Sequence, residues 1–283
     1  MDKIIIVGGY EFLGFSLCTA FLNKGNSVDC IHFDNIHDAF YEEKRFSVGR
    51  NANFLELSIA TWSKSELESN ENTVVMISFY DLFYKKDSAE LLEQFEMEWQ
   101  NILQSDRLNR SLLVFLFPLQ IIEKGVKWDD TFRSIANSVA KGTKEKNISF
   151  QAVYLPTLYG PWQPMEFLFQ QALLTEVKKE KDIEVNTKEW VKDAIYIDDA
   201  VNEIVCLIDE EKLDTPCLLK SSKREQWKNC ANFLGISPEL YHNIENAIIS
   251  ESDFRIIVIK DSIGVEQGLN LQKQHLLRIL SGV

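Results

Sequence analysis

The sequence predicts an α/β fold, a doubly wound parallel sheet followed by a smaller C-terminal α/β lobe. Strand-like and helix-like segments alternate from the N-terminus. The first strand, Ile4 to Val7, is apolar on both faces, as a central parallel strand must be. A glycine turn, Gly8 to Gly14, leads from it into a helix with an apolar stripe. We expect a main domain over residues 1–160 and the lobe over 161–283, with a segment near 188–210 returning to the main domain.

The elements of the main domain follow in order. The first helix ends near Gly25, which suits the left-handed conformation that often follows a helix. A helix over 88–104 carries apolar residues at helical spacing along its whole length. For the short helix predicted over 61–68, Thr61 or Ser63 is the expected cap. The predicted strands are 28–33, 53–57, 73–78, 112–117 and 149–155, and the other helices are 61–68 and 129–146.

The alternation loosens after Pro164, where the lobe is predicted. A strand over 254–260 is rich in β-branched residues, and the chain ends in an amphipathic helix over 267–280. The remaining elements of the lobe are an extended segment at 190–197, a strand at 217–220, and helices at 167–179, 198–208, 222–234 and 238–247.

Composition narrows the class of protein. Hydrophobic residues make up 45% and charged residues 26%, which is ordinary for a soluble globular chain. The net charge of -13 would repel a phosphate backbone, so nucleic acid is excluded as a partner. No apolar run approaches the roughly 18 residues that a membrane span needs. The N-terminus lacks a signal-peptide pattern, and a cytoplasmic location is expected.

Cysteines and histidines give no sign of a metal site. The five cysteines are odd in number and scattered, and they form no Cys-x-x-Cys pair, so we expect reduced and mostly buried thiols. None of the four histidines is spaced from a Cys, Asp or Glu as metal ligands usually are. The sequence therefore predicts that no metal is bound.

The glycine turn, which reads Gly8-Gly9-Tyr10-Glu11-Phe12-Leu13-Gly14, is typical of a dinucleotide site with one defect. In such a turn the first glycine makes the bend, the second lets the backbone approach a pyrophosphate, and the third lets strand and helix pack closely. Gly8 and Gly14 keep the first and third roles. Glu11 brings bulk and a negative charge to the second, at a helix terminus that attracts anions. Either the nucleotide site is altered, or the turn serves the fold alone.

Four segments resemble the extended short-chain dehydrogenase/reductase family, the NAD-dependent sugar epimerases and dehydratases. The turn is similar to the family's Gly-Gly-x-Gly-Phe-Ile-Gly, broken only at Glu11. Tyr159-Gly160-Pro161 is similar to the family's Tyr-Gly-Pro, and Lys192 to Ala200 to its Arg-Asp-Phe-Ile-Tyr-Val-Asp-Asp-Val. Gly264 to Leu269 is similar to its closing helix. The resemblance covers nearly the whole chain and implies a Rossmann-type fold.

The resemblance also implies a catalytic Tyr-x-x-x-Lys pair, in which the tyrosine exchanges a proton and the lysine lowers its pKa. Counted back from Tyr159, the pair falls at Trp128 and Phe132, which cannot transfer protons. None of the eight tyrosines has a lysine four residues further on. The family's catalytic Ser or Thr falls near Phe117 to Leu119, where there is no hydroxyl. We therefore predict no catalytic residue.

The resemblance assigns the other site residues. An acid at the end of the second strand would bind the adenosine ribose, and Asp34 lies about 20 residues past Gly14 as the fingerprint asks. The family register favours His32 for that place, and an ordinary loop carboxylate is an equal alternative for Asp34. Tyr159 and Pro161 are expected to shape the wall of the substrate cleft. The expected cofactor residues are Gly8, Gly9, Glu11, Phe12, Leu13, Gly14 and Asp34.

These observations support a degenerate family member that works as a nucleotide-binding, sensing or regulatory module rather than as an enzyme. The alternative is an active NAD(P)-dependent nucleotide-sugar epimerase, dehydratase or reductase with unusual catalytic residues. NAD or NADP is the cofactor that the resemblance implies, with Glu11 opposing it. The expected partner is a nucleotide or a nucleotide-sugar. The helix over 88–104 is apolar enough to allow a homodimer, although its stripe is also explained by packing on its own sheet.

Overall fold

A computed structural model describes residues 2–33, 40–65, 73–85, 88–104, 108, 111–122, 130–148, 150–178, 183–209, 215–244 and 249–281. The chain divides into two compact units. The first consists of Met1–Phe117, Lys127–Val153 and Lys212–Pro216, and the second of Pro118–Val126, Tyr154–Glu211 and Cys217–Val283. Within the described part of the chain, no helix has the length and hydropathy needed to cross a bilayer.

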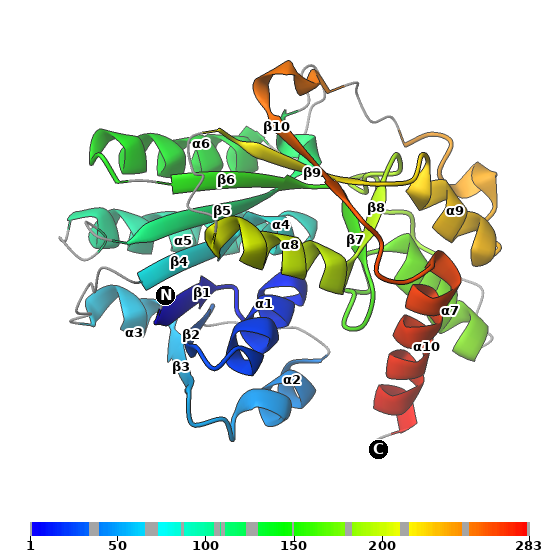
Figure 1. Ribbon diagram of the computed structural model, residues 1–283, viewed down its shortest axis with the longest axis horizontal. Helices are drawn as coiled ribbons and strands as arrows, with labels where there is room; N and C mark the ends of the chain where they lie inside the picture. The colour runs from blue at the N-terminus through cyan, green and yellow to red at the C-terminus, as the bar shows by residue number, and fades with distance from the viewer. Residues whose placement is uncertain are drawn as a thin grey trace. The chain divides into compact units, whose positions relative to one another are not determined.

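A parallel sheet forms the centre of the first unit. Its strands lie in the order β6, β5, β4, β1, β2, β3 (Figure 1). In the middle of the sheet, Val7 of β1 pairs with Ile31 of β2 and with Ile77 of β4. This order, with β1 between β2 and β4, confirms the predicted Rossmann-type sheet. The strands are β1 (Lys3–Val7), β2 (Ser27–His32), β3 (Phe54–Ser58), β4 (Thr73–Ser78), β5 (Leu112–Pro118) and β6 (Phe150–Leu155).

Helices connect these strands. They are α1 (Phe12–Asn23), α2 (Tyr41–Val48), α3 (Ile59–Lys64), α4 (Phe79–Tyr84), α5 (Ser88–Gln104) and α6 (Asp130–Glu145). Helix α5 packs against α3, α4 and α6, and its apolar stripe, including Leu92, Phe95 and Trp99, is fully buried. Packing within the unit thus accounts for the stripe, and the homodimer stays a prediction.

An aromatic cluster fills the core beside α5. The ring of Phe79 stacks on Phe117 at 5.0 Å between centroids and meets Phe95 edge-on at 5.5 Å. Phe132 of α6 packs edge-on against Phe79 at 6.1 Å and against Phe83 at 5.0 Å. Such edge-to-face pairs hold the helices at fixed distances from the sheet.

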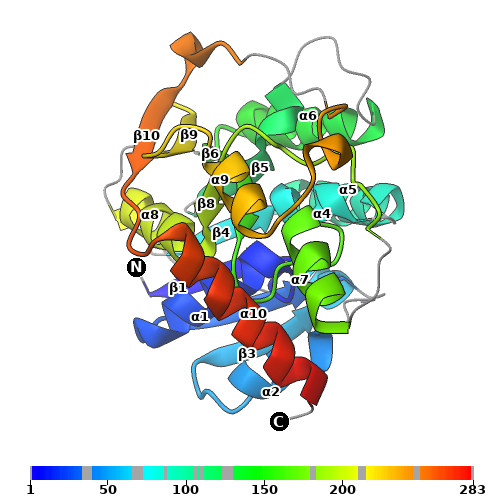
Figure 2. The same ribbon diagram turned by 90° about the vertical axis from the view of Figure 1, so that its right-hand side faces the viewer.

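The second unit contains two parallel strand pairs, β7 with β8 and β9 with β10. Helix α10 packs against α7 and α9, as Figure 2 shows. Short 3₁₀ helices occupy Leu119–Ile122, Pro238–Leu240 and Glu251–Asp253. The other elements are β7 (Thr157–Tyr159), α7 (Leu168–Lys178), β8 (Ala194–Tyr196), α8 (Ile197–Asp209), β9 (Cys217–Ser221), α9 (Gln226–Phe233), β10 (Arg255–Ile259) and α10 (Val265–Ser281).

Two local predictions are wrong, and one helix was not predicted. In the helix expected over 238–247, the described residues 238–244 contain only a 3₁₀ turn, Pro238–Leu240, none of whose residues is buried, and 245–247 lie outside the described residues. The cap of α3 is Ser58, whose hydroxyl accepts the Thr61 amide, rather than Thr61 or Ser63. Helix α4 was not predicted, since its run of aromatic residues shows no helical period.

Candidate functional site

The glycine turn between β1 and α1 has the backbone geometry that the sequence predicts. Gly8 has a φ of +82°, a conformation that favours glycine, and its amide donates to the Ile31 carbonyl at 2.9 Å. The Gly9 amide donates to the same oxygen at 3.2 Å. A Cβ on Gly14 would lie only 2.0 Å from the Gly8 carbonyl oxygen. The turn therefore keeps its glycines to let strand and helix meet, whether or not a ligand binds.

Glu11 is the N-cap residue of α1, but its side chain makes no capping hydrogen bond. It turns instead to Lys85, whose Nζ lies 2.6 Å from Glu11 Oε1. The Glu11 side chain is 9% exposed, so this ion pair is largely shielded from water. The Glu11 side chain thus lies against the turn, and the Lys85 ammonium group neutralises its negative charge.

A second carboxylate, Asp81 of α4, occupies the N-terminus of α1. One of its oxygens accepts the Leu13 amide at 3.0 Å, and the other accepts the Gly14 amide at 3.0 Å. The Ser78 hydroxyl donates to it at 2.7 Å. Burial raises the pKa of the Asp81 carboxyl, and the bonds from Leu13, Ser78 and Gly14 oppose that rise. Amide donors at a helix N-terminus are those that bind phosphate in such folds.

Lys44 of α2 completes the cluster. Its side chain is 1% exposed, and its Nζ donates to the Tyr10 carbonyl at 2.8 Å. Its charge also acts to lower the pKa of Asp81. Around the turn, the carboxylates of Glu11 and Asp81 are therefore balanced by the ammonium groups of Lys85 and Lys44. The residues present do not fit a dinucleotide, because the Asp81 carboxylate already accepts the Leu13 and Gly14 amides and the Glu11 carboxylate lies at the same turn.

The other predicted cofactor and catalytic positions are placed only in part. Asp34 and Trp128 lie outside the described residues. Phe132 is 2% exposed and lies in the aromatic core, which explains an aromatic residue there by packing. Phe117, near the expected hydroxyl position, is stacked in the same core. His32, the alternative to Asp34, lies 3.8 Å from the Glu56 carboxylate.

In the second unit, Tyr159 is a packing residue. It is 1% exposed and meets Tyr196 and Phe169 edge-on, at 5.7 and 6.2 Å between ring centroids. Burial raises the pKa of its hydroxyl far above the ordinary value. Pro161 is half-buried. Neither residue lines the cavity of this unit.

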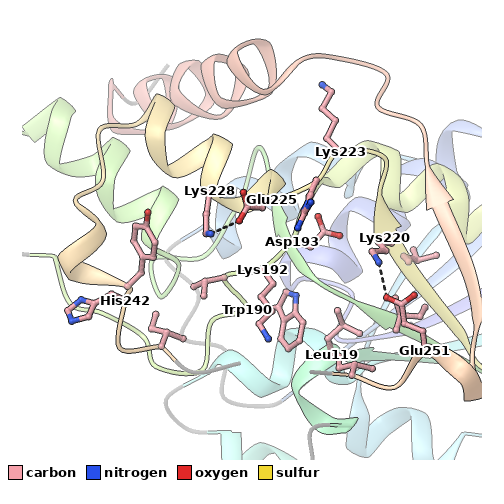
Figure 3. A pocket seen from close by; sticks show the side chains of 17 residues that line it. Leu119, Trp190, Lys192, Asp193, Lys220, Lys223, Glu225, Lys228, His242 and Glu251 are labelled. Atoms are coloured by element: carbon pink, nitrogen blue, oxygen red, sulfur yellow. Dashed lines mark hydrogen bonds and ion pairs between the residues drawn. The ribbon is translucent and has the colours of Figure 1, made fainter. Parts of the chain in front are cut away.

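That cavity has a volume of about 730 Å³. Figure 3 shows its charged side chains around an apolar floor. The floor is a cluster of Leu119, Trp190 and Leu218, with Ile249 packed against it. Five cationic side chains line the cavity against three carboxylates. The cations are Lys192, Lys220, Lys223, Arg224 and Lys228, and the carboxylates are Asp193, Glu225 and Glu251. The cavity is therefore net cationic in a chain of net charge -13.

The segment 189–193 is fixed at three points. The buried Glu189 carboxylate accepts the Leu168 amide and the Trp227 indole N–H, both at 2.9 Å. Burial raises the pKa of Glu189 to about 7, and those two bonds oppose the rise. The Thr157 hydroxyl donates to the Trp190 carbonyl at 2.7 Å. Asp193 accepts the Ser221 and Ala194 amides, both at 2.9 Å. Trp190 and Lys192, which line the cavity, are thereby held in place.

Several of the cations that line the cavity form ion pairs with carboxylates. Lys220 pairs with Glu251 at 2.8 Å, and Lys228 with Glu225 at 2.5 Å (Figure 3). The Lys192 Nζ lies 5.6 Å from the centroid of the Trp190 ring. The Trp190 indole N–H is buried without a hydrogen-bond partner among the described residues. Cations, an aromatic face and an unused donor are groups that bind an anionic ligand carrying a ring.

No group of three or more potential metal ligands occurs among the described residues.

Comparisons with known proteins establish the fold class. The chain has the fold of the NAD-dependent nucleotide-sugar epimerases and dehydratases. It matches the UDP-glucuronic acid 4-epimerase of Bacillus cereus, solved with UDP-glucuronic acid and NAD, with 14% identity and a TM-score of 0.69, over 98% of this chain and 99% of that one. The UDP-glucose 4-epimerase of Thermotoga maritima, solved with UDP-glucose, matches with 17% identity and a TM-score of 0.65, over 98% and 99% of the two chains.

Sequence comparison finds less similarity than structure comparison does. No protein-family model matches the chain. A curated relative is YjaV of Bacillus subtilis strain 168, an uncharacterised protein that is 24% identical over 166 residues. The match covers 58% of this chain and 65% of YjaV, so it spans less than two thirds of that relative.

Proposed function

We propose that this protein is a nucleotide-binding or nucleotide-sugar-binding module, sensing or regulatory in role, that has the epimerase/dehydratase fold without its redox chemistry. The cationic cavity of the second unit is the observation that carries the proposal. It combines Lys192 and Arg224 with the ring of Trp190 in an otherwise acidic chain. A diphosphate would bind to the cations, and a base or sugar would pack on the apolar floor.

The missing Tyr-x-x-x-Lys pair supports the absence of redox chemistry. The sequence contains no such pair, and Phe132 is an aromatic core residue at the expected lysine position. Proton exchange during hydride transfer needs a group with an accessible pKa near the reacting atom. A binding role does not require a proton-transferring residue at that position, since a ligand can be bound without being transformed.

Titration with nucleotides tests the proposal. UDP, UDP-glucose, UDP-glucuronic acid and a dTDP-sugar are added to the full chain, and binding is followed by calorimetry. We expect a micromolar Kd for at least one of them. Arg224→Ala should weaken that ligand by about tenfold or more, because it removes a charged group that lines the cavity.

Lys273→Ala is the matched control. This lysine lies on α10 and pairs with Glu176 at 2.5 Å, and it does not line the cavity. Its loss should leave the Kd unchanged. Failure of every nucleotide to bind, or equal weakening by both variants, would refute the cavity as the site.

The alternative function is an active NAD(P)-dependent epimerase, dehydratase or reductase. Its support is the preserved Tyr159-Gly160-Pro161 and Lys192 to Ala200 segments. Incubation of UDP- and dTDP-sugars with NAD, followed by chromatography of the sugar products, separates the two functions. We expect no product, and conversion of any sugar would favour the enzyme.

A further inference from the structure

Building on the proposed function, we infer that the N-terminus of α1 is liganded by the protein's own carboxylate. Asp81 takes the place of a dinucleotide pyrophosphate, and the Glu11–Lys85 ion pair covers the turn above it. The first unit is then complete without NAD or NADP.

The hydrogen bonds of Asp81 carry this inference. Its two oxygens accept the Leu13 and Gly14 amides separately, each at 3.0 Å. A phosphate group at a helix N-terminus uses the same kind of donors. Asp81 is 7% exposed, and the Ser78 hydroxyl holds it at 2.7 Å, so it is fixed on these donors before any ligand arrives.

Charge balance points the same way. The positive helix terminus attracts one anionic group, and Asp81 already supplies it. Lys85 Nζ lies 2.6 Å from Glu11, and Lys44 donates to the Tyr10 carbonyl, so both nearby ammonium groups have partners. An incoming pyrophosphate would have to displace these partners or sit beside Glu11 and Asp81.

The Glu11 side chain also packs against the turn. Its Cγ atom lies 3.6 Å, an ordinary van der Waals distance, from the position of a Cβ on Gly8. A dinucleotide turn keeps its middle position free of a side chain so that the backbone can approach the pyrophosphate. Here the side chain lies over the turn and is paired with Lys85.

The test is to remove the carboxylates of Glu11 and Asp81 by substitution and to add NAD or pyrophosphate in their place. The double variant Glu11→Gly with Asp81→Ala and the unmodified full chain are titrated with NAD and with inorganic pyrophosphate. Thermal unfolding and calorimetry are the measurements. Binding of either anion to the cavity of the second unit is common to both chains, so the shift of the unmodified chain is the baseline. The double variant should melt lower and should gain about 3 to 6 °C more than the unmodified chain with either anion. Its Kd for NAD should be at least about tenfold below that of the unmodified chain.

Glu98→Ala is the matched control. Glu98 is a buried carboxylate of α5 that accepts the Ser63 hydroxyl, and it lies at no helix N-terminus. Its loss should lower the melting temperature, and neither anion should raise it by more than it raises that of the unmodified chain. A larger rise in this control would show that the anions act nonspecifically, and would overturn the inference.

Two other results overturn it. One is NAD binding by the unmodified chain that slows hydrogen exchange in residues 3–23, the β1 strand, the turn and α1. The other is a folded double variant that gains no affinity for NAD or pyrophosphate. If the double variant does not fold, Glu11→Gly and Asp81→Asn decide the matter singly, and no gain in either counts against the inference. The nucleotide-sugar titrations test the cavity of the second unit. Their outcome therefore decides the proposed function independently of this inference.

Discussion

The two units treat anions in opposite ways. At the glycine turn of the first unit, Asp81 accepts the amides of Leu13 and Gly14, and Glu11 pairs with Lys85. The cavity of the second unit lines about 730 Å³ with an excess of cations. One site is satisfied by the chain itself, and the other leaves room for a ligand. We therefore propose that the usual cofactor site of the fold has become structural here, and that the cavity of the second unit is the ligand site.

Substitutions in the first unit should therefore act on stability, and those at the cavity on binding. The largest effect is expected for Phe132→Ala, which removes a buried ring from between Phe79 and Phe83. We expect a loss of about 3 to 5 kcal/mol in the free energy of unfolding. Urea denaturation measures it, and nucleotide affinity of the folded fraction should not change. A loss below about 1 kcal/mol would contradict a packing role for Phe132.

Gly14→Ala is expected to be nearly as severe. Its Cβ would lie 2.0 Å from the Gly8 carbonyl oxygen, so the backbone of the turn must move. The expected loss is about 3 kcal/mol, measured by urea denaturation. Gly264→Ala is the control, because a Cβ there meets nothing within 4 Å. Equal stability of the two variants would show that the turn does not need its glycine for packing.

The pH dependence of stability tests the second unit. Glu189 does for α7 what Asp81 does for α1, because its carboxylate accepts the amide of the first helical residue, Leu168. Burial raises its pKa from 4.5 to about 7. Since the folded pKa is the higher one, this contribution is fully present below pH ~4.5 and is lost as the pH rises towards ~7. The expected loss is about 3 kcal/mol.

Denaturation of the unmodified chain and of Glu189→Gln between pH 4.5 and 8 measures this loss. The variant cannot titrate at this position, so the difference between the two curves isolates Glu189. The unmodified chain should lose stability relative to the variant over that range. Parallel curves would show that Glu189 keeps an ordinary pKa.

The smallest effect is expected at the rim of the cavity. Glu251 holds Lys220 at 2.8 Å, and both side chains are about half exposed. Glu251→Gln removes a negative charge and releases Lys220, so an anionic nucleotide should bind about two- to threefold more tightly. Glu176→Gln, which frees Lys273 away from the cavity, is the control for calorimetry. Weaker binding in Glu251→Gln would mean that Glu251 itself contacts the ligand.

Periodicity explains which parts of the fold could be predicted. Helix α5 was predicted at its observed bounds, Ser88–Gln104, because its apolar spacing is regular. The strands β1 and β4 were predicted from their buried, β-branched runs. Helix α4 was missed, although Ser78 and Asp81 have the spacing of a helix-capping pair.

The sequence predicted only those parts of the candidate site whose residues are adjacent in the chain. Glu11 stands inside a known motif, so its conflict with a pyrophosphate is visible in the sequence. Asp81 bonds to Leu13 from 68 positions away, and only the fold brings them together. The cavity likewise joins Trp190 to distant cations. Its one sequence signal was the basic cluster from Lys220 to Lys228 in an acidic chain.

Hydrogen exchange measured by mass spectrometry compares the two regions in one experiment. The unmodified chain is labelled alone, with NAD, and with the nucleotide or nucleotide-sugar that binds most tightly. We predict that the nucleotide slows exchange in residues 190–193 and 218–228, around the cavity. NAD should leave exchange in residues 3–23, the β1 strand, the turn and α1, unchanged. Protection of residues 3–23 by NAD would contradict the claim that this chain satisfies its own dinucleotide turn.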